Sequence, residues 1–222
     1  MKKVLLNGMV LAFLGLSTVA CKNEAKNETN PKEAQEVAEA GAESATYAIN
    51  AAESKIDWVG SKPAGNHTGT VMLSKGEFTV DGDKLSGGTV VIDMTSIDVT
   101  DLEGEDRDKL MAHLKGTAEG QEDHFFNVAE FPTAMFQITE VKEMDGKTML
   151  AGNLTMKDIS KNIEIPVNYE VSENKLTLKS EPFTIDRTKW NVNYASKSVF
   201  DDLKDKFVND EIELSLVVIA TK

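Results

Sequence analysis

Side chains that could carry out catalysis are few in this sequence and widely spaced. The three histidines, His67, His113 and His124, share no metal-ligand spacing with one another or with the single cysteine. No G-x-S-x-G nucleophile motif and no glycine-rich phosphate loop occurs. The 37 acidic residues are so numerous that any one pair of carboxylates carries little information. The sequence therefore predicts a protein that is not an enzyme and that holds no metal ion or cofactor.

The single cysteine, Cys21, stands where it can be chemically modified. It follows a short basic start, an apolar run over Val4–Leu16 and the small residues Ser17–Ala20, which is the pattern of a signal peptide and its cleavage site. The run is too short to span a bilayer, which takes roughly 20 apolar residues. A cysteine at the first mature position resembles the lipobox of bacterial lipoproteins, although Thr18 replaces the usual leucine.

We therefore expect residues 1–20 to be a signal peptide and Cys21 to carry acyl chains such as palmitate. The acyl chains would anchor the protein in a membrane of the bacterial cell envelope, facing the periplasm or the surface, because each buried methylene contributes about 0.8 kcal/mol. The alternative is a soluble periplasmic protein. Residues 21–45 are rich in Lys, Asn, Glu and Ala, and we expect a flexible tether because such a segment buries too little apolar surface to offset its ordering entropy.

The elements that must position any site belong to a β protein. Residues 46–222 fit one domain, and apolar residues alternate with polar ones along residues 162–171 and again along 211–220. Turn sequences separate the alternating runs and predict hairpins at Asp81-Gly82-Asp83, Asp145-Gly146-Lys147 and Ser172-Glu173-Asn174. The predicted strands lie near residues 46–50, 54–60, 67–80, 84–94, 134–143, 147–156, 162–171, 174–185 and 210–220. Short helices are expected at residues 106–115 and 198–208.

An antiparallel sheet with one buried face must close into a barrel or stack on a second sheet. The consecutive hairpins favour the barrel. If it closes, the alternation directs one face of each strand into the lumen, where methionines would adapt to a ligand. The lumen candidates are Phe78, Val90, Ile92, Met94, Phe136, Ile138, Leu150, Leu154, Met156, Ile165, Val167 and Leu214.

Several motifs in this order resemble the YceI-like family of exported lipid-binding proteins. They are "TSIDVTD" from Thr95, Arg107-Asp108, "HLK" from His113, "HFFNVAEFP" from His124, "GNLTMKDISKNIEIPV" from Gly152 and "FTIDRTKWNVNY" from Phe183. Asp158 stands where the family commonly has glycine. The resemblance covers residues 46–222 and implies an antiparallel eight-stranded, lipocalin-like barrel with one or two short helices. It also implies that the lumen holds a long isoprenoid chain.

The segment His124–Phe136 contains four of the nine phenylalanines and reads as a loop entering a strand. Burial of each ring would stabilise the fold by roughly 1.5–3 kcal/mol. An aromatic plug between helix and barrel is therefore the first interpretation. The second is that Phe136 at least lines the lumen.

The two arginines are a further signal, because lysine serves at every other basic position. Arg107 and Arg187 each follow an aspartate, and a planar guanidinium can engage carboxylates or carbonyls through several hydrogen bonds. We expect Arg107, Asp108 and Arg187 to tie long loops to the barrel rim. A binding site for a lipid head group is the alternative.

These features favour a protein that sequesters or carries a long apolar lipid, an isoprenoid such as a quinone or polyprenol, in the barrel lumen. The alternatives are an envelope interaction module with a filled core and, less favoured, an enzyme acting on the bound lipid. Nucleic acid is not an expected partner, because removal of Lys2 and Lys3 takes the formal charge from −13 to −15, which repels phosphates. The sequence leaves a homodimer open.

Overall fold

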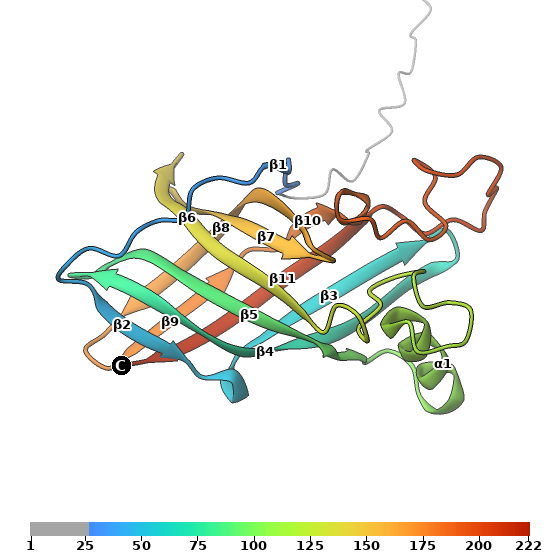
Figure 1. Cartoon of the computed structure of the whole chain (residues 1–222), viewed down its shortest axis with the longest axis horizontal. Coiled ribbons are helices and arrows are strands. Elements are labelled where there is room, and N and C mark those ends of the chain that lie inside the picture. The colour runs from blue at the N-terminus through green and yellow to red at the C-terminus, as the bar shows by residue number, and fades with distance from the viewer. Residues whose placement is uncertain (1–26) are drawn as a thin grey trace, which may run out of the picture.

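A computed structural model describes residues 27–222 and shows a barrel with one helix near one end (Figure 1). The predicted signal peptide and Cys21 lie outside the described residues. The helical elements are η1 (Ala51–Glu53, 3-10), α1 (Gly104–Lys115) and η2 (Arg187–Trp190, 3-10). The strands are β1 (Lys32–Glu33), β2 (Ala45–Ile49), β3 (Lys55–Lys62), β4 (Gly65–Asp81), β5 (Lys84–Val99), β6 (Thr133–Met144), β7 (Lys147–Met156), β8 (Ile159–Val171), β9 (Lys175–Ser180), β10 (Phe183–Asp186) and β11 (Glu211–Thr221).

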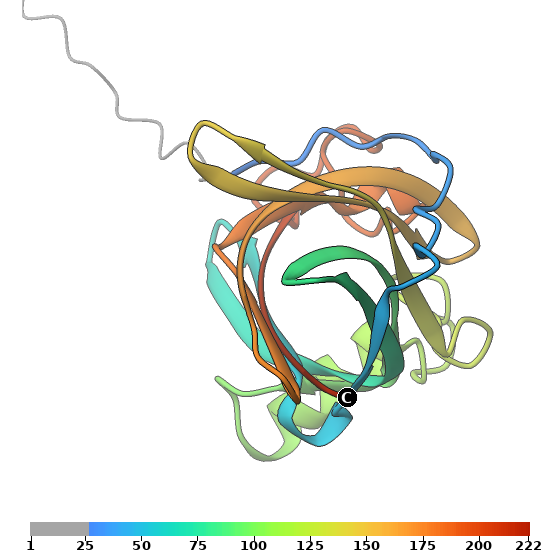
Figure 2. The same ribbon diagram turned by 90° about the vertical axis from the view of Figure 1, so that its left-hand side faces the viewer.

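The strands form one antiparallel sheet that curls into a ring, as the end-on view in Figure 2 shows. From β4 to β8 each strand pairs with the next one in the chain. β11 closes the ring, because it pairs with β2 and β3 on one side and with β9 and β10 on the other. β2 and β3 share one position around the ring and β9 and β10 share another, so the strands other than the two-residue β1 occupy eight positions. The prediction of an antiparallel eight-stranded barrel is therefore confirmed.

Local sequence explains where the strands run and turn. In β8 the alternating residues Ile163, Ile165 and Val167 are buried, as period two requires. The three predicted hairpin turns are present between β4 and β5, β6 and β7, and β8 and β9. In the β6–β7 turn both Asp145 (φ 53°) and Gly146 (φ 75°) have positive φ, as a type I′ turn demands.

One end of the barrel is closed by the β4–β5 hairpin, which bends across it (Figure 2). The bend falls at Gly76 (φ 152°) and Gly88 (φ 149°), which approach the facing strand closely. A Cβ would come within 2.3 Å of a facing carbonyl oxygen at Gly76 and within 2.5 Å at Gly88, so only glycine fits. The hairpin tip reaches the far wall, where the backbone N–H of Leu85 donates to the hydroxyl of Tyr169 (3.4 Å).

The opposite end, which we call the mouth, carries α1 and two long loops, residues 116–132 and 191–210 (Figure 1). The helix expected at residues 106–115 is present as α1 and ends at Gly116, whose φ of 69° suits a helix C-terminus. The helix expected at residues 198–208 is wrong, because these residues form a series of turns. Asp202 (φ 62°) and Lys204 (φ 50°) adopt left-handed conformations that a right-handed helix cannot accommodate.

The structure corrects the tether prediction for residues 27–40, which we call the strap. The strap lies along the outside of the barrel: the N–H of Thr29 donates to the carbonyl of Thr184 (3.0 Å), and β1 pairs with β8. Further along, the backbone of Gln35 exchanges two hydrogen bonds with the side chain of Asn153 (2.9 and 2.7 Å). β9 pairs with β8 but β10 does not, so the strap fills the space between β10 and β8. Composition missed this because backbone hydrogen bonds, not apolar burial, hold the strap.

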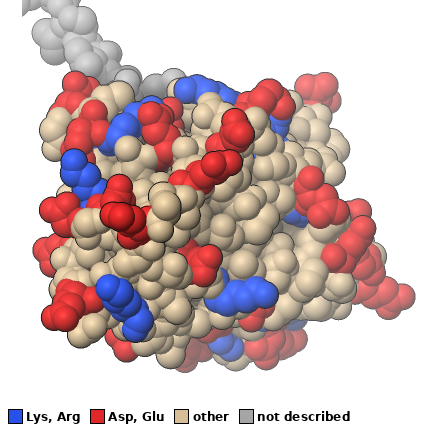
Figure 3. All heavy atoms as spheres, turned by 60° about the vertical axis from the view of Figure 1, so that its left-hand side comes forward, with Lys and Arg blue, Asp and Glu red and all other residues tan. Residues whose placement is uncertain are grey.

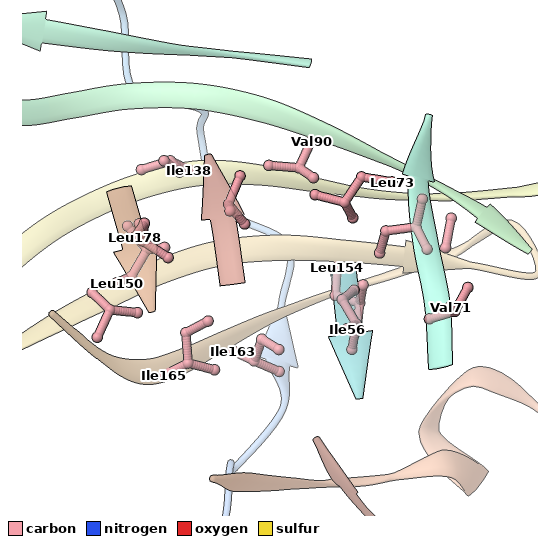
Figure 4. Packing of buried hydrophobic residues seen from close by; sticks show 14 of the residues in the cluster. Ile56, Val71, Leu73, Val90, Ile138, Leu150, Leu154, Ile163, Ile165 and Leu178 are labelled. Carbon is pink, nitrogen blue, oxygen red and sulfur yellow. The ribbon is translucent and has the colours of Figure 1, made fainter. Parts of the chain in front are cut away.

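The hydrophobic core occupies the lumen. In Figure 4 side chains from several strands point toward one another across the barrel, among them Ile56, Val90 and Leu154. The outer surface is different: on the face in Figure 3 acidic side chains predominate over basic ones, in keeping with a formal charge of −13. Among the described residues no helix has the length and apolar character needed to cross a membrane.

Candidate functional site

A cavity of about 400 Å³, which we call the outer chamber, opens at the mouth. Its volume lies in the range of roughly 300–1,000 Å³ that holds small-molecule ligands. α1 contributes Leu110 and Leu114 to the wall, and the loop before β6 contributes Phe125 and Phe126. Strand residues complete an apolar interior, whereas the rim is polar and includes Ser61, Lys62, His67, His113, Tyr194, Asp205, Lys206 and Asn209.

A smaller cavity of about 70 Å³, the inner chamber, lies deeper in the barrel. Its wall is wholly apolar and includes Phe78 from the bent hairpin and Leu178 from β9. None of the described residues that line it has a donor or acceptor side chain. The inner chamber is therefore suited to a hydrocarbon and offers nothing to a polar head group.

Four residues line both chambers and so mark the boundary between them; we call them the waist. They are Ile56, Ile92, Leu154 and Leu214. They come from β5, from β7 and from the neighbouring strands β3 and β11, so the waist has residues at three separate positions around the lumen. Figure 4 labels two of these residues, Ile56 and Leu154. A chain entering from the mouth must pass the waist to reach the inner chamber.

Two of the histidines that are scattered in sequence meet at the mouth. Nε2 of His113, on α1, lies 2.8 Å from Nδ1 of His124, in the loop that follows. The ring of Tyr194 stacks on His124, with centroids 4.4 Å apart, and Phe125 meets His113 edge-on at 5.0 Å. Since one nitrogen of the short contact must accept, at least one of the two rings is neutral. Burial lowers the pKa of His113 below its usual value, and the neighbouring His124 lowers it further.

The third histidine, His67, stands on another part of the rim. Its Nδ1 lies 2.9 Å from a carboxylate oxygen of Asp101, which also accepts from the backbone N–H of Thr68 (2.9 Å). Burial alone would raise the pKa of Asp101, but these hydrogen bonds hold it below its usual value. No group of three or more His, Cys, Asp or Glu side chains within residues 27–222 is placed to hold a metal ion.

Arg187 is buried at the root of the 191–210 loop and binds both of its stems. Its guanidinium donates to the carbonyls of Val192 (2.5 Å) and Tyr194 (2.9 Å) on one stem and of Val208 (3.1 Å) and Asn209 (3.0 Å) on the other. The carboxylate of Asp210 lies 3.6 Å from Nη2. Burial lowers the pKa of Arg187, and the charge of Asp210 opposes that change. With these donors committed, Arg187 has little left to offer an anionic head group.

Arg107 makes a smaller set of contacts. Its Nε donates to the carbonyl of Val99 (2.9 Å), and Nη2 donates to the carboxylate of Asp98, so α1 is joined to the end of β5. Asp108 lies 3.9 Å away with its side chain 76% exposed. The sequence predicted that Asp108 helps to tie a loop to the barrel rim, but the structure gives this role to Asp98, which binds Arg107. Asp98 and Arg107 are nine residues apart, and no local sequence pattern links residues at that separation.

The structure places ten of the twelve lumen candidates on the chamber walls. The outer chamber includes Ile92, Met94, Leu154, Met156 and Leu214. The inner chamber adds Phe78, Val90, Phe136, Leu150 and Ile165. Ile138 and Val167 are buried in the core but line neither chamber.

The aromatic segment from His124 serves both purposes that the sequence suggested. Phe125 is buried between the mouth loops and also lines the outer chamber, together with Phe126. Phe136 lines the inner chamber, and its ring occupies the space above Gly152, where a Cβ would come within 2.3 Å of it. Phe131 instead lies under the ammonium of Lys157, 5.8 Å from the ring centroid.

Sequence reasoning missed the polar mouth. His113, His124 and Tyr194 each occur in a motif that carries the family resemblance, which was the one available signal that they act together. Trp58 was missed as well. It lines the outer chamber, and Gly69 permits its position, because a Cβ there would come within 2.4 Å of the indole ring.

A family model described as the YceI-like domain matches residues 47–220 of this chain. Proteins named UPF0312 protein from Yersinia pestis (strain Pestoides F) and Yersinia pseudotuberculosis serotype O:3 (strain YPIII) are each 36% identical to it over 107 residues. The match covers 46% of this chain and 44% of each relative, so it spans less than half of the relatives' length.

Two solved structures share the fold. Burkholderia cenocepacia BcnA superposes with a TM-score of 0.61 at 21% identity, over 78% of this chain and 99% of BcnA. A polyisoprenoid binding domain from Saccharophagus degradans, implicated in plant cell wall breakdown, gives a TM-score of 0.57 at 16% identity, over 79% of this chain and 97% of that one. At these identities the likeness establishes the fold alone.

Proposed function

The chain belongs to the YceI-like domain family, and from this premise we propose that its barrel binds a long isoprenoid lipid and sequesters or carries it in the cell envelope. The observation that carries the proposal is the divided lumen: an apolar outer chamber with a polar rim leads through an apolar waist into a wholly apolar inner chamber. Apolar walls favour a hydrocarbon chain through the area that it buries. The Saccharophagus degradans domain, described as polyisoprenoid binding, supports the same ligand class.

The proposed ligand enters tail first and leaves its head at the mouth. Its head is neutral, as in a quinone or a polyprenol, because Arg187 is committed to backbone carbonyls and to Asp210. The basic rim residues Lys62 and Lys206 are exposed and are accompanied by Asp205. Such a rim offers hydrogen bonds to a head group but no concentrated positive charge for a phosphate.

The two alternatives fit the site less well. An interaction module with a filled core would not need a chamber of about 400 Å³. An enzyme acting on the lipid would need a base or nucleophile next to the chamber; of the two histidines that line it, His67 is bonded to Asp101 and His113 to His124. His113 and His124 form a closed pair. The two rings are bonded to each other and packed against Tyr194, an arrangement that suits a rigid rim better than proton transfer.

The location of the protein is part of the same proposal. Cys21, if acylated with chains such as palmitate, anchors the barrel to a membrane of the cell envelope and keeps it near a source of isoprenoid lipid. Cys21→Ser then releases the protein from the membrane fraction of the cell. Light scattering of the released protein decides between a monomer and a homodimer.

Met156→Trp tests lipid binding directly, because Met156 lines the outer chamber. The added volume should displace the lipid and leave the melting temperature nearly unchanged, since the ring takes the place of ligand. Met144→Trp, on the exposed β6–β7 hairpin, is the matched control and should change neither quantity. If Met156→Trp instead destabilises the protein by roughly 1–3 kcal/mol and the wild type never yields lipid, the lumen is a close-packed core and the proposal is wrong.

A further inference from the structure

The 191–210 loop has a fixed neck. Arg187 holds Val192 and Tyr194 on the outgoing stem and Val208 and Asn209 on the returning stem. The stems are also joined to each other, because the N–H of Val208 donates to the carbonyl of Ala195 (2.9 Å). The neck is therefore part of the rigid barrel.

The tip of this loop, residues 196–207, presents two apolar side chains to water. Val199 is 47% exposed and Phe200 is 48% exposed, and among the described residues the only other large apolar side chain this open is Met144 at 46%. The tip is held by turn bonds, such as those from the N–H groups of Val199 and Phe200 to the carbonyl of Ser196 (3.3 and 2.9 Å), and by the hydroxyl of Ser198, which donates to the carboxylate of Asp210 (2.5 Å). Asp202 and Lys204 adopt left-handed backbone conformations, which cost free energy in residues other than glycine.

The same loop forms part of the mouth. Residues 205–209 line the outer chamber, and the ammonium of Lys197 lies 3.4 Å from the ring centroid of Phe207, which joins the two sides of the tip. A lipid that enters or leaves the outer chamber must therefore pass beside this loop. Val199 and Phe200 do not line the chamber themselves, but they belong to the loop whose residues 205–209 do.

The loop also lies on the side where the described chain begins. The side chain of Asn27 donates to the carbonyl of Pro182 (2.9 Å), and Thr29 binds Thr184, just before the loop's own root. Figures 1 and 2 show the start of the strap and the loop on the same side of the barrel. An anchor at Cys21 would hold Asn27 within about 20 Å of the membrane, the reach of the chain between them.

The charge of the loop permits approach to a bilayer. Its four aspartates are nearly balanced by three lysines, in a protein whose formal charge is −13. These residues are Asp201, Asp202, Asp205 and Asp210, and Lys197, Lys204 and Lys206. A phospholipid surface is thus repelled less by this loop than by the acidic remainder of the protein.

We propose that the loop tip docks on a phospholipid bilayer and buries Val199 and Phe200 among the acyl chains, so that lipid moves between the bilayer and the outer chamber without crossing water. The docking surface is the tip itself, and its partner is the membrane to which the chain is tethered. The proposal rests on the proposed function for the identity of the cargo.

The test compares Val199→Ser/Phe200→Ser with Met144→Ser, an equally exposed apolar residue on the β6–β7 hairpin. All proteins carry Cys21→Ser, so that an acyl chain does not mask the loop. Vesicles of phosphatidylethanolamine and phosphatidylglycerol loaded with ubiquinone supply the lipid. The double variant should take up ubiquinone about tenfold more slowly than the parent and cosediment less with the vesicles, as expected for a loss of binding energy at the bilayer. Met144→Ser should match the parent.

Loading from detergent distinguishes an effect on docking at the bilayer from an effect on binding in the lumen. Both variants should bind as much ubiquinone as the parent when it is supplied in detergent, because neither touches the chambers. Equal uptake rates and equal cosedimentation for the double variant and Met144→Ser would overturn the docking proposal and leave the lipid-binding function standing. If the parent takes up ubiquinone from neither source, the quinone cargo fails, and cosedimentation alone then decides whether the loop docks.

Discussion

The two ends of the barrel are built by different means. Strands alone make the closed end, where the β4–β5 hairpin bends at Gly76 and Gly88 over a wholly apolar inner chamber. A helix and two loops make the mouth, where polar groups of His113 and Tyr194 stand beside apolar walls. The contrast gives the lumen a direction. A ligand with one apolar and one polar end fits it in a single orientation, with the tail toward the hairpin and the head toward α1.

The waist is where the two ends meet, and a charge there should have the largest effect. Ile92→Asp places a carboxylate without a partner between the chambers. We expect it to abolish lipid retention and to lower the free energy of unfolding by about 3–5 kcal/mol, measured by urea titration. Ile92→Val is the control and should cost about 0.5–1.5 kcal/mol. Wild-type stability in Ile92→Asp would mean that water, not an apolar interior, fills the lumen.

The two arginines sharpen the description of the mouth. Arg187→Lys replaces a buried guanidinium that binds four carbonyls with a point charge that cannot reach them all, so we expect a loss of about 2–4 kcal/mol. Arg107→Lys, at a half-exposed ion pair, should cost less than about 1 kcal/mol. Thermal unfolding compares them. Equal losses in the two variants would show that the neck of the 191–210 loop is not held by Arg187.

The waist should also set how long a tail the barrel accepts. Leu154→Phe narrows the passage to the inner chamber, and we expect about tenfold weaker binding of long polyprenols with little change for farnesol. Leu154→Ala widens it and should shift the preference toward longer chains. Competition against a fluorescent prenyl probe measures both. An unchanged length preference in both variants would show that the inner chamber takes no part in binding.

The smallest effect concerns the pH response of the mouth. Because the pKa of His113 in the folded protein is lowered by burial and by His124, the unfolded chain takes up this proton first as the pH falls. The free energy of unfolding should therefore decrease below about pH 6.5, the usual histidine value, and level off below the folded pKa. His113→Gln should flatten this slope. If the free energy of unfolding of the variant and of the wild type changed with pH in parallel, His113 would not be the source of the pH dependence.

The strands and hairpins of the barrel could be predicted from the sequence, but the contacts at the mouth and the path of the strap could not. Period-two alternation located strands such as β8, and Asp-Gly turns located the hairpins, because both are local signals. The contact between His113 and His124 depends on how the 116–132 loop folds back onto α1, which no spacing rule encodes. The strap was missed for a similar reason, since its backbone bonds to Thr184 and β8 are made across more than a hundred residues.

The predicted helix at residues 198–208 shows the limit of periodicity. Val199, Leu203 and Phe207 recur every four residues, yet the tip turns at Asp202 and Lys204 and leaves Val199 exposed. Of the three residues Phe207 lines the outer chamber whereas Val199 is exposed, so the spacing of four does not mark one buried helical face.

Organic extraction of the purified wild-type protein, followed by mass spectrometry, tests the central claim most directly. Met156→Trp, whose outer chamber is filled, is extracted in parallel as the blank. We predict that the wild type releases a long isoprenoid lipid with a neutral head, such as a quinone or polyprenol, and that the variant does not. Recovery of no isoprenoid from a folded wild-type protein, or of equal amounts from both proteins, would contradict the account.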